Sequence, residues 1–414
     1  MHFFTSINLN YLPKARVLAK SVKRNCKDSW FTLVLSDKLP DEFDLSSEPF
    51  DEVWLITELG LPVENINLWI FKHTVVELCT AVKGQALLKA LNSSRSDKIV
   101  YLDPDTVVFD DLSALDDLMD EHDIIITPHI TRPLNNKDYI DNIEINSILA
   151  HGVYNLGFLA VKKSEEGINF ATWWRDRLME YCIDDVSSGL FTDQKWIDMA
   201  PALFNVHILK NTAFNVAAWN VMQRNISSNN DKYYVDGYPL QFYHFTGFDS
   251  GAHMMCVNSY APGNESLFNL LRWYNDEQKQ GNENIYAKAV SIYNVYSNNE
   301  AVTPSQRYLL RIRKDLHEKF KEQNPYNVTG DDKCYYTWYK NEFTDNNRVE
   351  IPHPYDRDKR LKDLEKQVVN FSSGRQLLKA YIRMVIHSKI RNPEKRKNVI
   401  NFFVRLNKKL KFGK

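Results

Sequence analysis

The stretch from Lys98 to Phe109 carries the residues of this sequence that are best placed to do chemistry. A short apolar run ends in Asp103-Pro104-Asp105, so two carboxylates stand one residue apart. The run has the length and the β-branched residues of a buried strand. Ligands of open α/β sheets bind at the carboxyl ends of such strands. Pro104 fixes its own φ and favours an extended Asp103, which stiffens the backbone between the two acids.

Two carboxylates held this closely repel each other unless a cation lies between them. Oxygen ligands of this kind suit Mg²⁺ or Mn²⁺, often together with the phosphates of a substrate. The spacing therefore predicts a divalent metal site at Asp103 and Asp105. The alternative is a turn without a ligand, because Pro and Asp are both common in turns.

Strands and helices alternate around this motif, which predicts an α/β domain with a largely parallel sheet. Gly84 is expected to interrupt or kink the longest of the helical patterns. Beyond about residue 262 the pattern changes to helices and polar loops. The expected strands are 3–7, 31–35, 53–56, 98–102, 124–127, 154–161 and 240–248, and the expected helices are 15–22, 67–91, 112–121 and 170–181.

Other polar residues fall at the ends of these elements or interrupt them. Asn155 and Gly157 interrupt an apolar strand, and a glycine there indicates a bulge or the close approach of a ligand or of another backbone segment. Asp193 could be a helix cap instead of a ligand-binding residue. A single histidine such as His244 is more often structural than a metal ligand, but here Gly247 follows it in a glycine turn.

Together these residues resemble the metal-dependent glycosyltransferases of the GT-A fold, and most of all the retaining galactosyl- and glucosyltransferases of family 8. The resemblance covers roughly the first two-thirds of the chain. It implies a Rossmann-like domain that binds a nucleotide sugar on a mostly parallel sheet. A mainly helical C-terminal region is expected to follow.

The resemblance also implies a role for each matching residue. Mn²⁺ (or Mg²⁺) would be held by Asp103, Asp105 and His244. The donor nucleotide would be bound by Thr5, Ser6, Asn8 and Tyr11, with the Tyr11 ring stacked on uracil, and Gly247 would lie beside it. The sugar pocket and its catalytic groups would be formed by Asn155, Gly157, Asp193 and Gln194.

One position departs from the family pattern. The last family motif is His-x-x-Gly-x-x-Lys-Pro-Trp, in which the lysine meets a phosphate, but this sequence has Ser250 at the lysine position. Another cation must then face the diphosphate, or the metal must do more of that work. Lys83 precedes the Asp-x-Asp strand at a suitable interval, so it is expected to supply this charge.

The prediction is therefore a retaining glycosyltransferase that moves a sugar from a nucleotide diphosphate donor, with UDP-sugar favoured. The expected acceptor is a saccharide or a lipid-linked saccharide of surface polysaccharide, lipopolysaccharide or capsule. A sugar-phosphate nucleotidyltransferase is an alternative, but it would need a glycine-rich phosphate loop, and residues 5–13 contain no glycine. A non-catalytic carbohydrate-binding or assembly protein of this fold would be expected to lose part of the Asp103, Asp105 and His244 set.

Composition places the 414-residue chain among ordinary globular proteins. The five cysteines are scattered without a Cys-x-x-Cys pair, which predicts reduced thiols and not zinc ligands or disulfides. No apolar run approaches the length of a membrane span, and the first residues carry no basic leader. A cytoplasmic location is therefore expected.

Charge is unevenly distributed along the chain. Residues 355–414 contain 18 Lys and Arg against 5 Asp and Glu, although the totals of 52 and 53 nearly balance. Within 375–414 the apolar residues recur at helical spacing, so this basic tail either packs on the body or lies on an anionic membrane, such as the inner face of the plasma membrane. Nucleic acid is not an expected partner. The predicted parts are a catalytic domain 1–262, a helical extension 263–354 that could bind the acceptor, and the tail 355–414.

Overall fold

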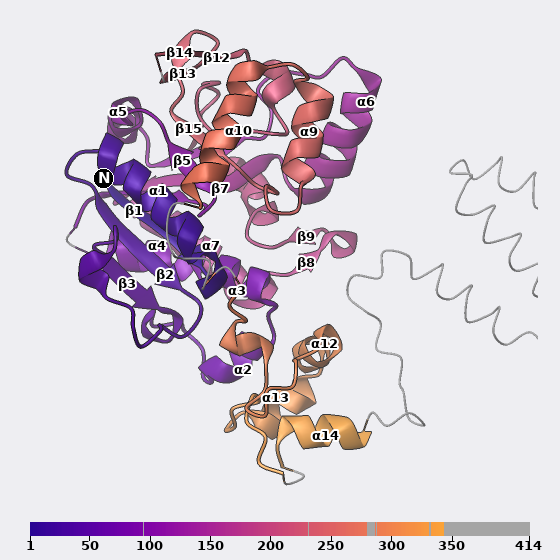
Figure 1. The fold of residues 1–414 in the computed structure, drawn as a ribbon. Coiled ribbons are helices and arrows are strands. Elements are labelled where there is room, and N and C mark those ends of the chain that lie inside the picture. The colour runs from indigo at the N-terminus through magenta and orange to yellow at the C-terminus, as the bar shows by residue number, and fades with distance from the viewer. Residues whose placement is uncertain (94, 231, 280–285, 287, 331–332, 343–414) are drawn as a thin grey trace, which may run out of the picture. The chain divides into compact units, whose positions relative to one another are not determined.

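A seven-stranded, mostly parallel sheet forms the centre of the protein (Figure 1). The computed structural model describes residues 1–342 except 94, 231, 280–285, 287 and 331–332, so the predicted tail lies outside the described residues. Within this sheet β7 alone runs antiparallel to its neighbours. In spatial order the strands are β10 (Val206–Ile208), β6 (Ile124–Pro128), β7 (Tyr154–Lys162), β4 (Lys98–Leu102), β1 (His2–Ile7), β2 (Trp30–Leu35) and β3 (Glu52–Leu55).

Helices cover both faces of the sheet, as the α/β prediction requires. Successive residues of a strand point to opposite faces, and Phe3 and Phe4 of β1 accordingly belong to two different cores. The Phe3 core includes side chains of α1 (Leu12–Asn25) and α5 (Ser113–Glu121). The Phe4 core includes side chains of α4 (Lys83–Leu91) and α7 (Glu165–Tyr181). Because both faces are buried, the strands have nearly continuous apolar sequences.

The single long helix predicted at 67–91 is wrong, because three helices occupy this segment. They are α2 (Ile66–Phe71), α3 (Val75–Ala81) and α4, and the second break falls at Val82, before Gly84. Gly84 lies inside α4, where a Cβ would come within 2.6 Å of Arg175 Cα on α7. This glycine therefore permits close helix packing and does not kink the chain.

A second, small sheet carries the end of the Asp-x-Asp segment. It has the order β11 (Val216–Ala217), β15 (Phe242–His244) and β5 (Thr106–Val108), and β15 runs antiparallel to β5. The predicted strand 240–248 is therefore too long, since only Phe242–His244 is a strand, but the glycine turn expected at its end is present at Gly247. His244 pairs in register with Thr106, which places it beside Asp105.

Shorter elements complete the region before residue 262. A π-helical segment, Ile140–Leu149, follows α6 (Lys137–Tyr139) and precedes β7. The remaining elements are β8 (Asp184–Asp185), β9 (Leu190–Phe191), α8 (Ala200–Leu203), β12 (Ile226–Asn229), β13 (Lys232–Val235) and β14 (Tyr238–Pro239).

The region after β15 is helical in its described part, in agreement with the predicted composition of a C-terminal extension. Two of its arginines reach the segments around α2 and α3: Arg307 donates to the carbonyl of His73 at 2.6 Å, and Arg311 pairs with the buried Glu77 at 2.7 Å. These contacts connect the C-terminal helices to the wall of the sheet domain. The helices are α9 (Ala252–Tyr260), α10 (Glu265–Glu277), α12 (Pro304–Ile312), α13 (Lys314–Phe320) and α14 (Tyr335–Glu342).

No described helix combines the length and apolar character that crossing a membrane would demand. The five cysteines, all among the described residues, form no disulfide bond, as predicted.

Two buried histidines lead us to expect lower stability in mild acid. Burial lowers the pKa of His2 to about 4 and that of His73 to about 3. In the unfolded chain both would titrate near 6.5, so below that pH the unfolded state binds more protons than the folded state. Their contribution to stability is fully present above about pH 6.5 and is lost as the pH falls toward 4.

Urea unfolding between pH 7.5 and pH 5 measures this effect. The free energy of unfolding should fall by about 1.4 kcal/mol per pH unit for each histidine below pH 6.5. His73 Nδ1 donates to the Trp69 carbonyl at 2.8 Å, and His73→Asn can keep that donor. This variant should show a shallower pH dependence, and an unchanged slope would contradict the assignment.

Candidate functional site

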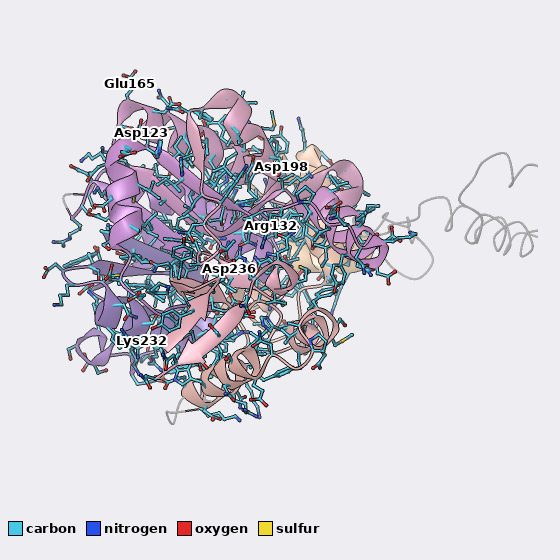
Figure 2. The ribbon with its side chains drawn as sticks, turned by 90° about the horizontal axis from the view of Figure 1, so that it is seen from above. Asp123, Arg132, Glu165, Asp198, Lys232 and Asp236 are labelled. Carbon is cyan, nitrogen blue, oxygen red and sulfur yellow. The ribbon has the colours of Figure 1, made fainter. Side chains whose placement is uncertain are left out.

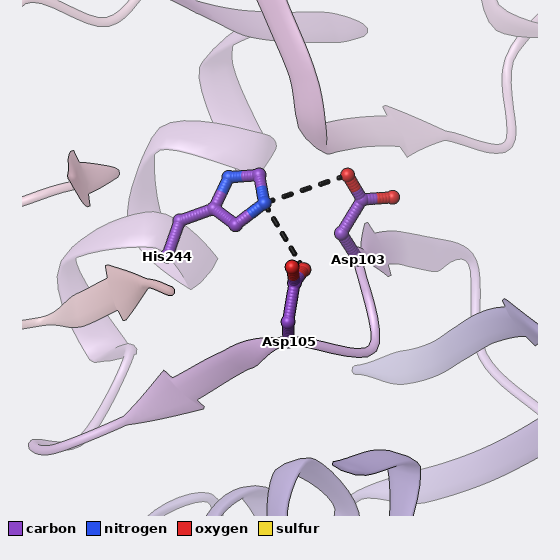
Figure 3. A group of neighbouring side chains, drawn as sticks. All are labelled: Asp103, Asp105 and His244. Carbon is purple, nitrogen blue, oxygen red and sulfur yellow. Dashed lines mark ion pairs between the residues drawn. The ribbon is translucent and has the colours of Figure 1, made fainter. Parts of the chain in front are cut away.

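Three potential metal ligands converge at the carboxyl end of β4 (Figure 3). Asp103 follows β4 directly, Asp105 precedes β5, and His244 ends β15. One ligand atom from each lies within 4.8 Å of the other two. His244 Nε2 is 3.1 Å from Asp105 Oδ1 and 3.6 Å from Asp103 Oδ2. The chain therefore brings together the three residues predicted to hold the metal.

Backbone hydrogen bonds fix these three residues to the sheets. The Asp103 N–H donates to the Gly157 carbonyl of β7 at 2.9 Å, which extends the β4–β7 pairing by one residue. The Asp105 carbonyl accepts from the Phe245 N–H at 2.8 Å. The Asp-x-Asp turn is thus held from one side by the large sheet and from the other by β15.

Gly157 makes room for the histidine. A Cβ at this position would stand 2.4 Å from His244 Cε1 and 2.5 Å from His244 Nδ1. Trp219 packs edge-on against the same imidazole, with the ring centroids 5.3 Å apart. The close approach that a glycine in this strand predicts is therefore made by a side chain of the protein itself.

Lys83 extends from α4 to the other side of Asp103. Its ammonium lies 3.1 Å from Asp103 Oδ1 and 2.9 Å from Asp193 Oδ2. The same Nζ lies over the Tyr101 ring, 4.2 Å from the ring centroid. Among the described residues, the Lys83 ammonium is the single polar group in contact with Asp193 Oδ2. This buried oxygen is available to a donor from a ligand.

The pKa values in the site follow from burial competing with charge. Burial disfavours the charged form of Lys83, but Asp103 and Asp193 outweigh it and raise the pKa of Lys83 above its usual value. Burial raises the pKa of Asp193, although the Lys83 charge opposes this. For Asp105, His244 outweighs burial and the pKa is lowered. The site is thus a dense set of opposite charges largely withdrawn from water.

Asn155 and Gln194 form an amide network along one wall of the pocket. Asn155 Oδ1 accepts from the Gly157 N–H and from Asn215 Nδ2, both at 3.0 Å. Gln194 Oε1 accepts from the Leu156 N–H at 3.2 Å, and Gln194 Nε2 donates to the His151 carbonyl at 3.1 Å. These amides are occupied by protein groups, so their observed role is to position β7 and the adjoining loop.

A pocket opens over Asp103, Asp105 and His244. Its volume of about 530 Å³ is within the range of small-molecule sites. The predicted residues that line it are Ser6, Asn8, Tyr11, Lys83, Asp103, Asp105, Asn155, Asp193, Gln194 and His244. Three predicted residues are not among its lining. Thr5 is fully buried in β1, Gly157 lies beneath His244, and Gly247 occupies a turn with φ +70°.

Sequence reasoning missed several residues of this pocket. Tyr101 donates a short hydrogen bond to Asp103 and carries the Lys83 ammonium on its ring. It stands two residues before Asp103, so strand alternation could have placed both on one face. Trp219 and His129 also line the pocket, and their rings pack edge-on against each other with the ring centroids 5.3 Å apart. Trp219 lies in a loop, where no sequence pattern indicates its position.

The loops beside the pocket are fastened by charged side chains that Figure 2 labels. Asp198 accepts from the Val153 N–H at 2.7 Å and pairs with Lys195 at 3.0 Å, which joins the segment before β7 to the loop that carries Gln194. Arg132 donates to the Gln223 carbonyl and so ties the segment after β6 to the Trp219 loop.

The donor set suits a divalent cation. Two carboxylates and one imidazole nitrogen combine hard oxygen ligands with a borderline nitrogen, which Mn²⁺ accepts well. The side chains of Asp103 and Asp105 are 26% and 12% exposed, so one face of the group opens to the pocket. Asp103, Asp105 and His244 can therefore hold a metal where it would meet a pocket ligand.

Comparison with known sequences finds relatives without an established function. No family model matches the chain. It is 30% identical over 176 residues to the uncharacterized protein YfnF of Bacillus subtilis (strain 168), which is 42% of this chain and 57% of YfnF. It is 23% identical over 251 residues to the uncharacterized protein YfnD of the same organism, or 60% of this chain and 78% of YfnD. The chain thus spans less than two thirds of YfnF.

Comparison with solved structures finds glycosyltransferases at low identity. The galactosyltransferase LgtC, in complex with donor and acceptor sugar analogs, is similar with a TM-score of 0.38 and 17% identity over 68% of this chain and 96% of LgtC. GlyE of Streptococcus pneumoniae TIGR4 has a TM-score of 0.40 and 13% identity over 71% of this chain and 66% of GlyE. The mostly parallel sheet with an Asp-x-Asp group at the end of a central strand agrees with the GT-A fold that the sequence resemblance implies.

Proposed function

We propose that this chain is a metal-dependent glycosyltransferase that uses a nucleotide diphosphate sugar. The observation that carries the proposal is the convergence of Asp103, Asp105 and His244 within 4.8 Å at the edge of a pocket large enough for a nucleotide sugar. A nucleoside diphosphate leaves poorly until its charge is neutralised. Asp103, Asp105 and His244 would hold a divalent ion, which would supply that charge as a Lewis acid.

We assign one side of the pocket to the nucleotide and the other side to the sugar. Asn8 and Tyr11, from the loop after β1, line one part of the pocket, and the Tyr11 ring offers a surface for a base. Asp193, in the loop after β9, presents a buried carboxylate oxygen that can accept from a sugar hydroxyl. Fixed sugar hydroxyls would orient the anomeric carbon against the acceptor.

UDP-sugar as donor, Mn²⁺ as metal and retention of configuration are the finer parts of this proposal. They rest on the resemblance of the sequence motifs to the retaining enzymes of family 8. A saccharide or lipid-linked saccharide of a surface polysaccharide is the proposed acceptor. Contact with an anionic membrane through residues 375–414 stays a prediction of the sequence, since that segment lies outside the described residues.

Release of nucleotide from a panel of UDP-, GDP- and ADP-sugars tests the proposal directly. We expect UDP release that requires Mn²⁺ or Mg²⁺ and disappears when the ion is chelated. Pyrophosphate consumption with a sugar 1-phosphate product would instead indicate a nucleotidyltransferase. If no donor is cleaved or bound, a non-catalytic role is favoured. NMR of the first product from an α-linked donor settles the stereochemistry, and a β product would contradict retention.

A further inference from the structure

Lys14 is a buried ammonium with an exposed counterion. It lies in the first turn of α1, directly after Pro13, and its side chain is only 8% exposed. Its carboxylate partner is Asp249, whose Oδ2 lies 2.5 Å from the Lys14 Nζ, but the Asp249 side chain is 62% exposed. Removing an ammonium from water is costly unless a partner compensates for it. Here the compensation comes from a residue that could return to water with little loss.

The Lys14 ammonium also retains hydrogen-bonding capacity. A lysine ammonium has three N–H donors. Among the described residues Asp249 alone accepts a hydrogen bond from it, and the Tyr11 ring lies beneath the Nζ at 4.3 Å. Two donors are therefore left for another acceptor.

The position of Lys14 relates it to the site. Tyr11, on which its ammonium lies, and Thr246, three residues before Asp249, both line the pocket. By contrast, Lys83 already faces two carboxylates, those of Asp103 and of the buried Asp193.

We propose that Lys14 binds the diphosphate of the donor and that Asp249 is a placeholder, which pairs with Lys14 in the free protein and yields to the phosphate. This inference rests on the proposed function, since it assigns a further residue to that same site. A diphosphate carries more negative charge than one carboxylate and offers several acceptor oxygens. The exposed Asp249 can turn into solvent, whereas the ammonium stays on the Tyr11 ring.

Calorimetric binding of UDP and of uridine to the full chain, with and without Mn²⁺, tests this exchange. Lys14→Met should weaken UDP binding about ten- to a hundredfold, the effect of losing hydrogen bonds to a charged group. It should leave uridine binding unchanged, because uridine has no phosphate. Asp249→Asn should have the opposite effect and strengthen UDP binding several-fold without Mn²⁺, since the competing charge is gone.

Lys23→Met provides a matched control. Lys23 lies on the same helix and pairs with Asp51, and neither residue lines the pocket. This variant should bind UDP as the unmodified chain does. Lys14→Arg should recover most of the affinity lost in Lys14→Met, because it restores the charge.

Because Lys14→Met and Asp249→Asn are expected to change UDP affinity in opposite directions, the proposed exchange can be tested. If Asp249→Asn weakens UDP binding as Lys14→Met does, the ion pair is structural and the placeholder role is overturned. Equal UDP affinity in Lys14→Met and the unmodified chain would also overturn it, while leaving the glycosyltransferase proposal intact. Absence of binding to UDP, GDP and ADP by the unmodified chain would remove the proposed function and this inference together. If Lys14→Met folds poorly, the UDP affinity of the surface variant Asp249→Asn is sufficient to test the exchange.

Discussion

Asp103→Ala and Asp105→Ala are each expected to abolish sugar transfer while the fold is retained. Each removes one of two carboxylates that converge with His244, and neither side chain belongs to an apolar core. Loss of a metal carboxylate removes stabilisation of the leaving diphosphate on the order of several kcal/mol, or about a thousandfold or more in rate. Turnover in saturating Mn²⁺, with urea unfolding in parallel, measures both parts of the expectation.

The two variants should differ in their side effects. Asp103→Ala also removes the partner of Tyr101 and one of the two carboxylates that face Lys83. Asp111→Ala is the matched control, because this nearby carboxylate contacts Ser113 at the start of α5 and is not part of the pocket lining. Near-normal turnover by either site variant would refute the metal assignment.

Gly157→Ala is expected to reduce metal affinity about ten- to a hundredfold, the usual effect of disturbing a group that orients a ligand. The added Cβ would stand 2.4 Å from His244 Cε1, so the imidazole must leave its present position 3.1 Å from Asp105 Oδ1. Titration of the apoprotein with Mn²⁺ measures the change without relying on catalysis. Transfer activity at limiting Mn²⁺ should fall with it.

Two comparisons isolate this effect from general damage. Gly84→Ala also creates a close contact, with Arg175 Cα on α7, but it should lower stability and leave Mn²⁺ affinity unchanged. His244→Ala combined with Gly157→Ala should be no worse than His244→Ala alone, since both act through one ligand. A wild-type Mn²⁺ affinity in Gly157→Ala would show that the ring has room to move.

The sequence was most informative where one local property decides the structure. The strand from Lys98 to Leu102 is apolar because both of its faces are buried, and Asp103 and Asp105 stand out because they end that run. The α/β class follows from the same alternation of strands and helices. The resemblance then selected residues that the fold brings to one pocket, although their individual roles stay predictions.

Features that depend on contacts between residues far apart in the chain could not be predicted from local sequence patterns. In 66–91 the first helix break ends at a capping box formed by Thr74 and Glu77, and the second break, at Val82, also precedes Gly84. The pairing of Lys14 with Asp249 joins residues 235 positions apart, and Lys14 alone looks like an ordinary helical lysine. Trp219 likewise reaches the pocket through loop geometry that no periodicity encodes.

The contact between Arg311 and Glu77 has an evolutionary consequence. Glu77 is fully buried on α3, the helix whose Val76, Cys79 and Thr80 form one wall of the pocket. Its charge is matched by an arginine that lies 234 positions later in the chain. A recombination event that exchanged the C-terminal helices for those of another protein would remove the arginine that pairs with this buried carboxylate. We therefore expect Glu77 and Arg311 to be inherited as a pair, and lineages that lose one to lose the other.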